Sequence, residues 1–185
     1  MIICIRDGRK APRFLEWSSI VDAPTTHGMT RAEMLRYLRR EHGAAEVENH
    51  KARVERAEKT GTSSVGGDQS AEDVARFNRA GPEELSLTFG AVVRAYVRGE
   101  RLDFSASAKA IHALRSWECG PRNVLDGIEP YLLFAVEPAA DKVRVEVQCN
   151  AGDARTEFTL DVADTAATTR AKCEAAKAAI RKAAE

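Results

Sequence analysis

Apolar and polar residues alternate strictly in two segments near the C-terminus. In residues 142–149 the apolar positions are Val143, Val145, Val147 and Cys149. Residues 155–162 alternate in the same way, with Thr156, Phe158, Leu160 and Val162 expected to face inward. This pattern predicts two strands with one buried face and one wet face. Residues 131–136 are continuously apolar, as is typical of a strand buried on both faces. The short connections between these segments predict an antiparallel meander.

Helical periodicity dominates the middle of the chain. Apolar residues three and four positions apart predict helices over about 30–42, 44–59, 70–79, 89–97 and 104–117. In the helix at 70–79, Val74 and Phe77 are expected to be buried. Thr30 and Glu33 have the spacing of a capping box at the start of the first helix. A last, alanine-rich helix is expected from Asp164 or Thr165 to about Ala184. The Gly/Ser-rich residues 60–70 predict an exposed loop.

The N-terminus predicts a β-hairpin. Residues 2–6 are rich in isoleucine, and Asp7-Gly8 is a strong turn signal. The return strand is expected from Arg9 to about Trp17, and Pro12 places it at an edge or breaks it.

These elements predict an α+β fold over residues 1–185. The expected architecture is an antiparallel sheet covered by helices, built from the N-terminal hairpin and the C-terminal three-strand meander. A helical block at about 30–120 is inserted between the two β pieces. The alternative is two subdomains, the block 30–120 and a β-β-β-α unit at 121–185, joined near Gly120-Pro121.

Composition and charge narrow the class of protein. The chain has 28 Lys+Arg, 28 Asp+Glu and 44% hydrophobic residues, which is ordinary for a globular protein. A formal net charge of zero excludes binding to nucleic acid or anionic membrane by bulk electrostatics alone. No apolar run approaches the roughly 18–20 residues of a membrane span, and the N-terminal run is too short for a signal peptide. A cytoplasmic protein is therefore expected.

No motif of a common catalytic or cofactor site is present. The sequence has no phosphate-binding P-loop, no Gly-x-Gly-x-x-Gly after a strand, no His-Glu-x-x-His and no Gly-x-Ser-x-Gly. Scattered histidines without metal-ligand spacing are interpreted as surface or boundary residues: His27, His42, His50 and His112. The cysteines lack a Cys-x-x-Cys pair, and three of them are expected as buried reduced thiols: Cys4, Cys149 and Cys173. No catalytic residue, metal or cofactor is predicted.

The distribution of charge favours a non-enzymatic interaction or assembly protein. Arg36, Tyr37, Arg39 and Arg40 form a cluster of the residue types enriched at protein interfaces. Residues 1–13 and the last helix are basic, whereas residues 138–164 are acidic. Such a chain is suited to bind a protein partner or to pair with copies of itself. A small enzyme with a site assembled from distant residues is a third possibility.

Sequence-specific DNA binding is the alternative function. Two amphipathic helices over residues 91–117 are compatible with a helix-turn-helix, whose second helix enters the major groove. The candidate nucleic-acid contacts are Arg94, Arg98, Lys109, His112 and Arg115. The excess of basic residues over this stretch favours the interpretation, whereas the long connection from Gly99 to Phe104 disfavours it.

Three short stretches resemble a group of phage proteins. Val21-Asp-Ala-Pro24, Gly28-Met-Thr30 and Asn78-Arg-Ala-Gly-Pro82 resemble segments of uncharacterised small proteins of tailed-phage and prophage genomes. The resemblance covers about residues 14–98 and does not extend to the β-β-β-α end. It implies a phage-encoded virion component or inhibitor of a host system, acting in the host cytoplasm or in the virion. It implies no activity and no catalytic residue.

Overall fold

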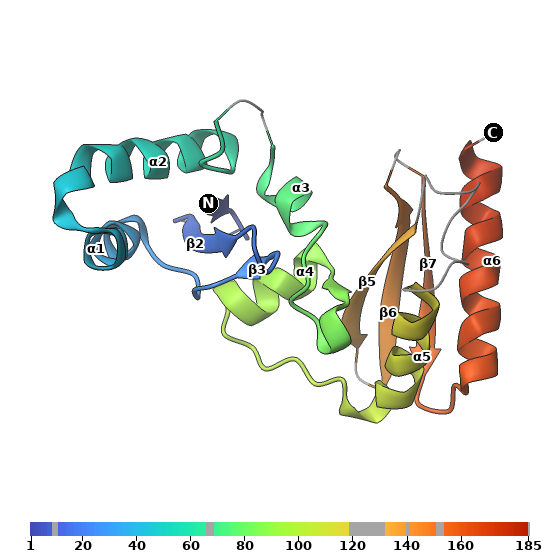
Figure 1. The fold of residues 1–185 in the computed structure, drawn as a ribbon. Helices are drawn as coiled ribbons and strands as arrows, with labels where there is room; N and C mark the ends of the chain where they lie inside the picture. Colours follow the sequence, from blue (N-terminus) through green and yellow to red (C-terminus); the bar gives the residue numbers. More distant parts are fainter. Residues whose placement is uncertain (9–10, 66–68, 119–131, 140, 151–153, 185) are drawn as a thin grey trace. The chain divides into compact units, whose positions relative to one another are not determined.

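The chain folds into two compact units. The computed structural model describes residues 1–8, 11–65, 69–118, 132–139, 141–150 and 154–184 (Figure 1). Unit 1 comprises Met1–Arg79 and Val92–Arg101, and unit 2 comprises Ala80–Ala91 and Leu102–Glu185. The predicted α+β class is confirmed, but the strands form two sheets instead of the single expected sheet. The chain passes from one unit to the other near residues 80, 92 and 102. The junction predicted near Gly120-Pro121 lies outside the described residues.

Unit 1 contains an antiparallel sheet of order β1-β2-β3. Its strands are β1 (Ile2–Ile5), β2 (Arg13–Ser18) and β3 (Ala23–Pro24). The predicted hairpin is confirmed, although β2 begins only after Pro12, which has no N–H to donate to a ladder. The outer side of β1 is not free, because Cys4 N–H donates to Gly61 O at 2.7 Å and Ser63 N–H donates to Ile2 O at 2.8 Å.

These bonds correct the prediction of an exposed loop at 60–70. Thr62 and Ser63 are 0% and 7% exposed, since they lie along β1 and satisfy its backbone groups. Val65, two residues further on, is 83% exposed. The exposed part of the segment therefore begins after its pairing with β1.

Helices α1 (Arg31–His42) and α2 (Val47–Thr60) lie on the unit 1 sheet, and a short 3₁₀ turn, η1 (Ala44–Glu46), joins them. The predicted capping box is confirmed, with Thr30 and Glu33 bonded to one another's backbone N–H. A buried apolar cluster holds the helices to the sheet: Ile2, Cys4, Phe14, Met34, Leu38, Val54 and Ala57. Burial of these apolar side chains stabilises the unit.

Two predicted helices differ from the structure. The helix at 70–79 is only α3 (Ala71–Ala75), so Phe77, expected to be buried, is 46% exposed. The helix at 89–97 begins as α4 (Phe89–Val92) and continues as a π-helix, η3 (Val93–Val97). Arg98 N–H accordingly donates to Val93 O, five residues back, at 3.0 Å.

Unit 2 contains a sheet of order β4-β5-β6-β7. After a 3₁₀ turn, η2 (Pro82–Glu84), its strands are β4 (Ser86–Leu87), β5 (Leu132–Ala139), β6 (Lys142–Cys149) and β7 (Arg155–Asp161). The predicted meander of β5, β6 and β7 is confirmed. The short strand β4, which the sequence pattern misses, pairs in parallel with β5.

One face of the unit 2 sheet is covered by α5 (Ala108–Glu118), which follows η4 (Ser105–Ser107), and by α6 (Ala166–Ala184) (Figure 1). Trp117 of α5 packs edge-on against Phe134 of β5, with 5.3 Å between ring centroids. The expectation that β5 is buried on both faces is wrong, because Leu133 and Ala135 on its other face are only partly buried. Val162, expected to face inward, is 56% exposed because β7 ends at Asp161.

Cys4, Cys149 and Cys173 are buried and free, as predicted, whereas Cys119 lies outside the described residues. Burial raises the pKa of the Cys4 thiol to about 11 and that of Cys173 to about 12. No helix in the described ranges has the length and apolar character needed to cross a membrane.

Candidate functional site

Helix α1 separates apolar and basic residues onto different faces. Met34 and Leu38 are 0% exposed and pack into the core of unit 1. Three arginines of the predicted cluster lie exposed on the rest of the helix and are called here the arginine face: Arg36, Arg39 and Arg40. The fourth member of that cluster, Tyr37, is half-buried between the two faces.

The members of the arginine face differ in their partners. Arg40 donates to Glu41 at 2.7 Å, and its guanidinium lies 5.8 Å from the centroid of the Tyr37 ring. Arg36 and Arg39 form no hydrogen bond or ion pair with another residue of the described ranges. These two guanidinium groups are therefore available to an external acceptor.

Tyr37 is fixed in place by a carboxylate of the neighbouring strand. Its hydroxyl donates to Glu16 Oε2 of β2 at 2.5 Å. Burial and this hydrogen bond raise the pKa of Tyr37 to about 12. The phenol is therefore neutral at physiological pH and acts as a donor.

Glu16 is also bonded to the C-terminal end of α1. Its second oxygen, Oε1, lies 2.9 Å from Nε2 of His42, and the Glu16 side chain is only 16% exposed. Burial opposes ionisation of this carboxyl, but the hydrogen bonds from Tyr37 and His42 outweigh it and hold the pKa of Glu16 below its ordinary value. We call Glu16, Tyr37 and His42 the Glu16 cluster.

The second histidine of this region, His50, lies buried in unit 1. His50 is 2% exposed, so its interpretation as a surface or boundary residue is wrong. Its Nε2 lies 3.1 Å from Gly43 O, and its ring centroid lies 6.3 Å from that of His42. Among the described residues, no group of three or more His, Cys, Asp and Glu side chains is arranged to hold a metal ion.

The candidate DNA-binding residues are distributed over both units. Arg94 donates to Glu100 at 2.8 Å, and Arg98 lies 3.4 Å from Asp7, both within unit 1. Lys109 is exposed on α5 of unit 2. Because a helix-turn-helix is one packed motif, its division between two units gives this alternative no support.

The remaining two candidates, His112 and Arg115, contact glutamates. His112 Nδ1 lies 3.0 Å from Glu83. Arg115, with a side chain 19% exposed, lies 2.7 Å from Glu118 and 3.4 Å from Glu84. These carboxylates occupy the donors that would contact bases or phosphates. DNA binding stays a prediction that no observation favours.

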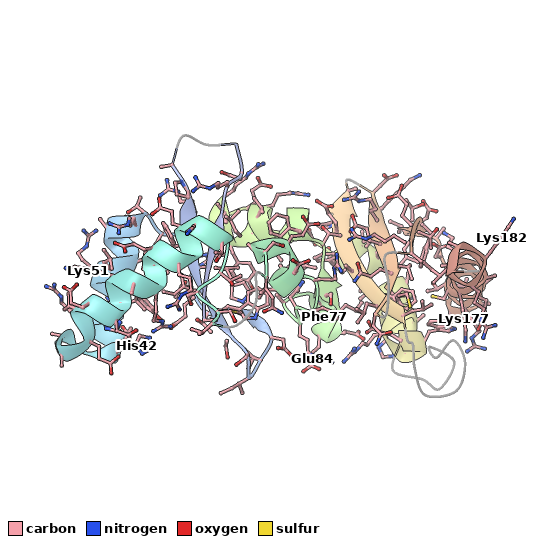
Figure 2. The ribbon with its side chains drawn as sticks, turned by 90° about the horizontal axis from the view of Figure 1, so that it is seen from above. His42, Lys51, Phe77, Glu84, Lys177 and Lys182 are labelled. Atoms are coloured by element: carbon pink, nitrogen blue, oxygen red, sulfur yellow. The ribbon has the colours of Figure 1, made fainter. Side chains whose placement is uncertain are left out.

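The segregated charges of the C-terminal region are partly neutralised within unit 2. On the open sheet face, Arg144 lies 2.5 Å from Glu137, 3.1 Å from Glu146 and 3.8 Å from Glu157. Figure 2 labels Lys177 and Lys182 on the basic helix α6.

Sequence reasoning finds the arginine face but misses Glu16. The arginines are adjacent on one predicted helix, whereas Glu16 is 21 positions before Tyr37 and on a strand. Comparisons with protein-family models, with curated proteins and with solved structures find no match to this chain. The functional interpretation therefore depends on the geometry of the site.

Proposed function

We propose that this chain is a non-enzymatic protein-interaction protein whose arginine face binds an acidic surface of a partner protein. The observation that carries the proposal is that Arg36 and Arg39 are exposed and bond to no other described residue. Guanidinium groups bind carboxylates through paired hydrogen bonds, so an acidic surface supplies the acceptors that both lack.

The Glu16 cluster supports this proposal by ordering the site before a partner binds. Glu16 holds the hydroxyl of Tyr37, and the Arg40 guanidinium lies over the Tyr37 ring. Side chains that are already oriented lose less conformational entropy on binding. The exposed ion pair of Arg40 with Glu41 stabilises little, so Arg40 is free to exchange its partner.

A protein partner is favoured over nucleic acid. The formal net charge is zero, and the arginines have acidic neighbours on the same helix, Glu33 and Glu41. A phosphate backbone would be repelled by these carboxylates, whereas a protein surface of mixed charge can avoid them. A role as a phage virion component or inhibitor of a host system stays a hypothesis from the resemblance.

Site-specific photo-crosslinking in cells that express the gene tests the proposal. The crosslinker replaces Ala32, which is exposed on α1. A protein adduct is expected, and Arg36→Glu with Arg39→Glu should abolish it. The charge-matched control is Lys59→Glu with Arg101→Glu, which changes two exposed residues of unit 1 and should leave the adduct unchanged.

A crosslinker at Ala175, exposed on α6, measures the background of random collisions. The proposal is wrong if the Ala32 adduct is no stronger than this background. It is equally wrong if nuclease removes the adduct, since the partner would then be nucleic acid, or if the arginine variant retains it.

A further inference from the structure

Strand β7 forms one edge of the unit 2 sheet. Among the described residues, the order β4-β5-β6-β7 leaves it paired with β6 on one side only (Figure 1). An edge strand offers backbone N–H and C=O groups to another strand unless side chains or bulges block them.

The register determines which way each backbone group points. Cys149 and Ala154 lie directly opposite one another, and Cys149 N–H donates to Ala154 O at 3.2 Å. In an antiparallel ladder, such hydrogen-bonded pairs alternate with pairs whose groups point away. The N–H and C=O groups of four residues therefore point outward from the sheet: Arg155, Glu157, Thr159 and Asp161.

The C-terminal half of this edge is closed by side chains. Lys172 of α6 donates from Nζ to Thr159 O at 2.7 Å. Asp161 N–H donates to Asp164 Oδ2 at 2.8 Å, and the same carboxylate accepts from Lys172 at 2.6 Å. Both closed groups belong to outward-pointing residues, which agrees with the register. A further strand cannot pair here without displacing Lys172 and Asp164.

The N-terminal half of the edge is open. The backbone groups of Arg155 and Glu157 have no hydrogen-bond partner among the described residues. We propose that this half pairs with β7 of a second copy of the chain, antiparallel, about a two-fold axis at Thr156. Arg155 then lies opposite Glu157 of the second copy, and Glu157 lies opposite Arg155 of the second copy.

Charge complementarity favours a second copy of the chain as the partner of β7 and Thr156 as the position of the two-fold axis. A two-fold interface must be complementary to itself. Axes at Arg155 or Glu157 would place like charges directly opposite, which destabilises a strand pair. An axis at Phe158 would oppose Arg155 to Asp161 but would need the groups that Lys172 and Asp164 hold.

Of the axes that pair described residues of β7 with one another, the axis at Thr156 satisfies both conditions. It uses the open backbone groups, pairs unlike charges on the open sheet face and places Thr156 beside its own copy, a favourable cross-strand pair. So short a ladder is a small interface, so we expect association only at high protein concentration. The contact lies in unit 2 and does not depend on the arginine face.

Sedimentation velocity over a concentration series of the full chain tests this dimer. Arg155→Glu and Glu157→Arg each place like charges opposite one another and should weaken self-association at least about tenfold. The double variant restores unlike pairs and should associate like the native chain. An equimolar mixture of the two single variants should form a heterodimer, because each then opposes unlike charges.

Arg170→Glu, an exposed substitution on α6, is the charge-matched control and should leave association unchanged. Circular dichroism of every variant verifies the fold. A native chain that stays monomeric at about millimolar concentration overturns the inference. So does self-association that both single variants retain, or a mixture of them that forms no heterodimer.

Discussion

The hydroxyl of Tyr37 on α1 lies 2.5 Å from the carboxylate of Glu16, which belongs to the central strand of the unit 1 sheet. The other carboxylate oxygen binds His42 at the end of the same helix. One partly buried acid thus attaches α1 to β2 at two points, and the arginine face lies on the helix that it holds. Substitutions of Glu16 and Tyr37 should therefore lower the free energy of unfolding of unit 1.

Glu16→Gln should destabilise unit 1 at pH 7 by about 1–2 kcal/mol, because hydrogen bonds to a charged acceptor are stronger than those to a neutral one. The pKa of Glu16 is lowered in the folded state, so its contribution is present above the ordinary carboxyl pKa and is lost as pH falls through the folded value. The difference between variant and native chain should therefore shrink in acid. Urea unfolding followed by Trp17 fluorescence, in a Trp117→Phe background, measures it; equal stability at pH 7 would contradict the assignment.

Tyr37→Phe should remove the hydrogen bond to Glu16 and keep the ring packing, at a cost of about 1 kcal/mol. The pKa of Tyr37 is raised from 10.0 to about 12, so the neutral phenol stabilises the fold fully below the ordinary value. That contribution is lost as pH rises towards the folded value. An ultraviolet titration should show a late-ionising tyrosine that the variant lacks. If the tyrosine that the variant lacks ionises at the ordinary value, the hydrogen bond does not persist in solution.

Lys172→Met should destabilise unit 2 by about 1–2 kcal/mol, since Thr159 O and the Asp164 carboxylate both lose a donor. Burial opposes ionisation of Asp164, but hydrogen bonds, that of Lys172 foremost, hold its pKa below the ordinary value. The Asp164 contribution is present above the ordinary value and lost as pH falls through the folded one, so the cost should be smaller in acid. Thermal unfolding followed by Trp117 fluorescence, in a Trp17→Phe background, is the measurement. Lys182→Met, an exposed change on α6, should have almost no effect.

Alkylation of the folded protein should leave Cys4 and Cys173 unmodified. Both thiols are buried and free, and burial raises their pKa to about 11 and about 12. Little thiolate is then present at neutral pH, and the reagent has no access to it. Mass spectrometry of peptides from the folded and the urea-unfolded chain compares the two states. Rapid labelling of either cysteine in the folded chain would contradict the burial.

Regular patterns made much of the fold predictable. Alternation locates β6 and β7, because one face of each strand is wet. The Thr30 and Glu33 capping box locates the start of α1. The arginine face follows from residue spacing on that helix, since residues three and four positions apart share a side.

Other features depend on contacts that spacing does not encode. Strand β4 has only two residues, too few to alternate, and it forms because β5 pairs with it. Helix α3 ends at Ala75, although the helical periodicity of the sequence continues to Phe77. Phe77 therefore lies outside the helix and is exposed. The hydrogen bond from Tyr37 to Glu16 forms only when α1 packs on β2. Thr62 becomes buried only when its segment pairs with β1.

The discontinuity of unit 1 limits how the protein can be dissected. Its second segment, Val92–Arg101, packs against the first segment, Met1–Arg79. There Gly28 N–H donates to Tyr96 O at 2.6 Å, and the approach is so close that a Cβ on Gly28 would lie 3.0 Å from Val97 Cα. A fragment truncated after Arg79 would lack this segment and leave that amide without its acceptor. Isolating either unit therefore requires a circularly permuted or internally spliced gene, and a simple terminal deletion damages both halves.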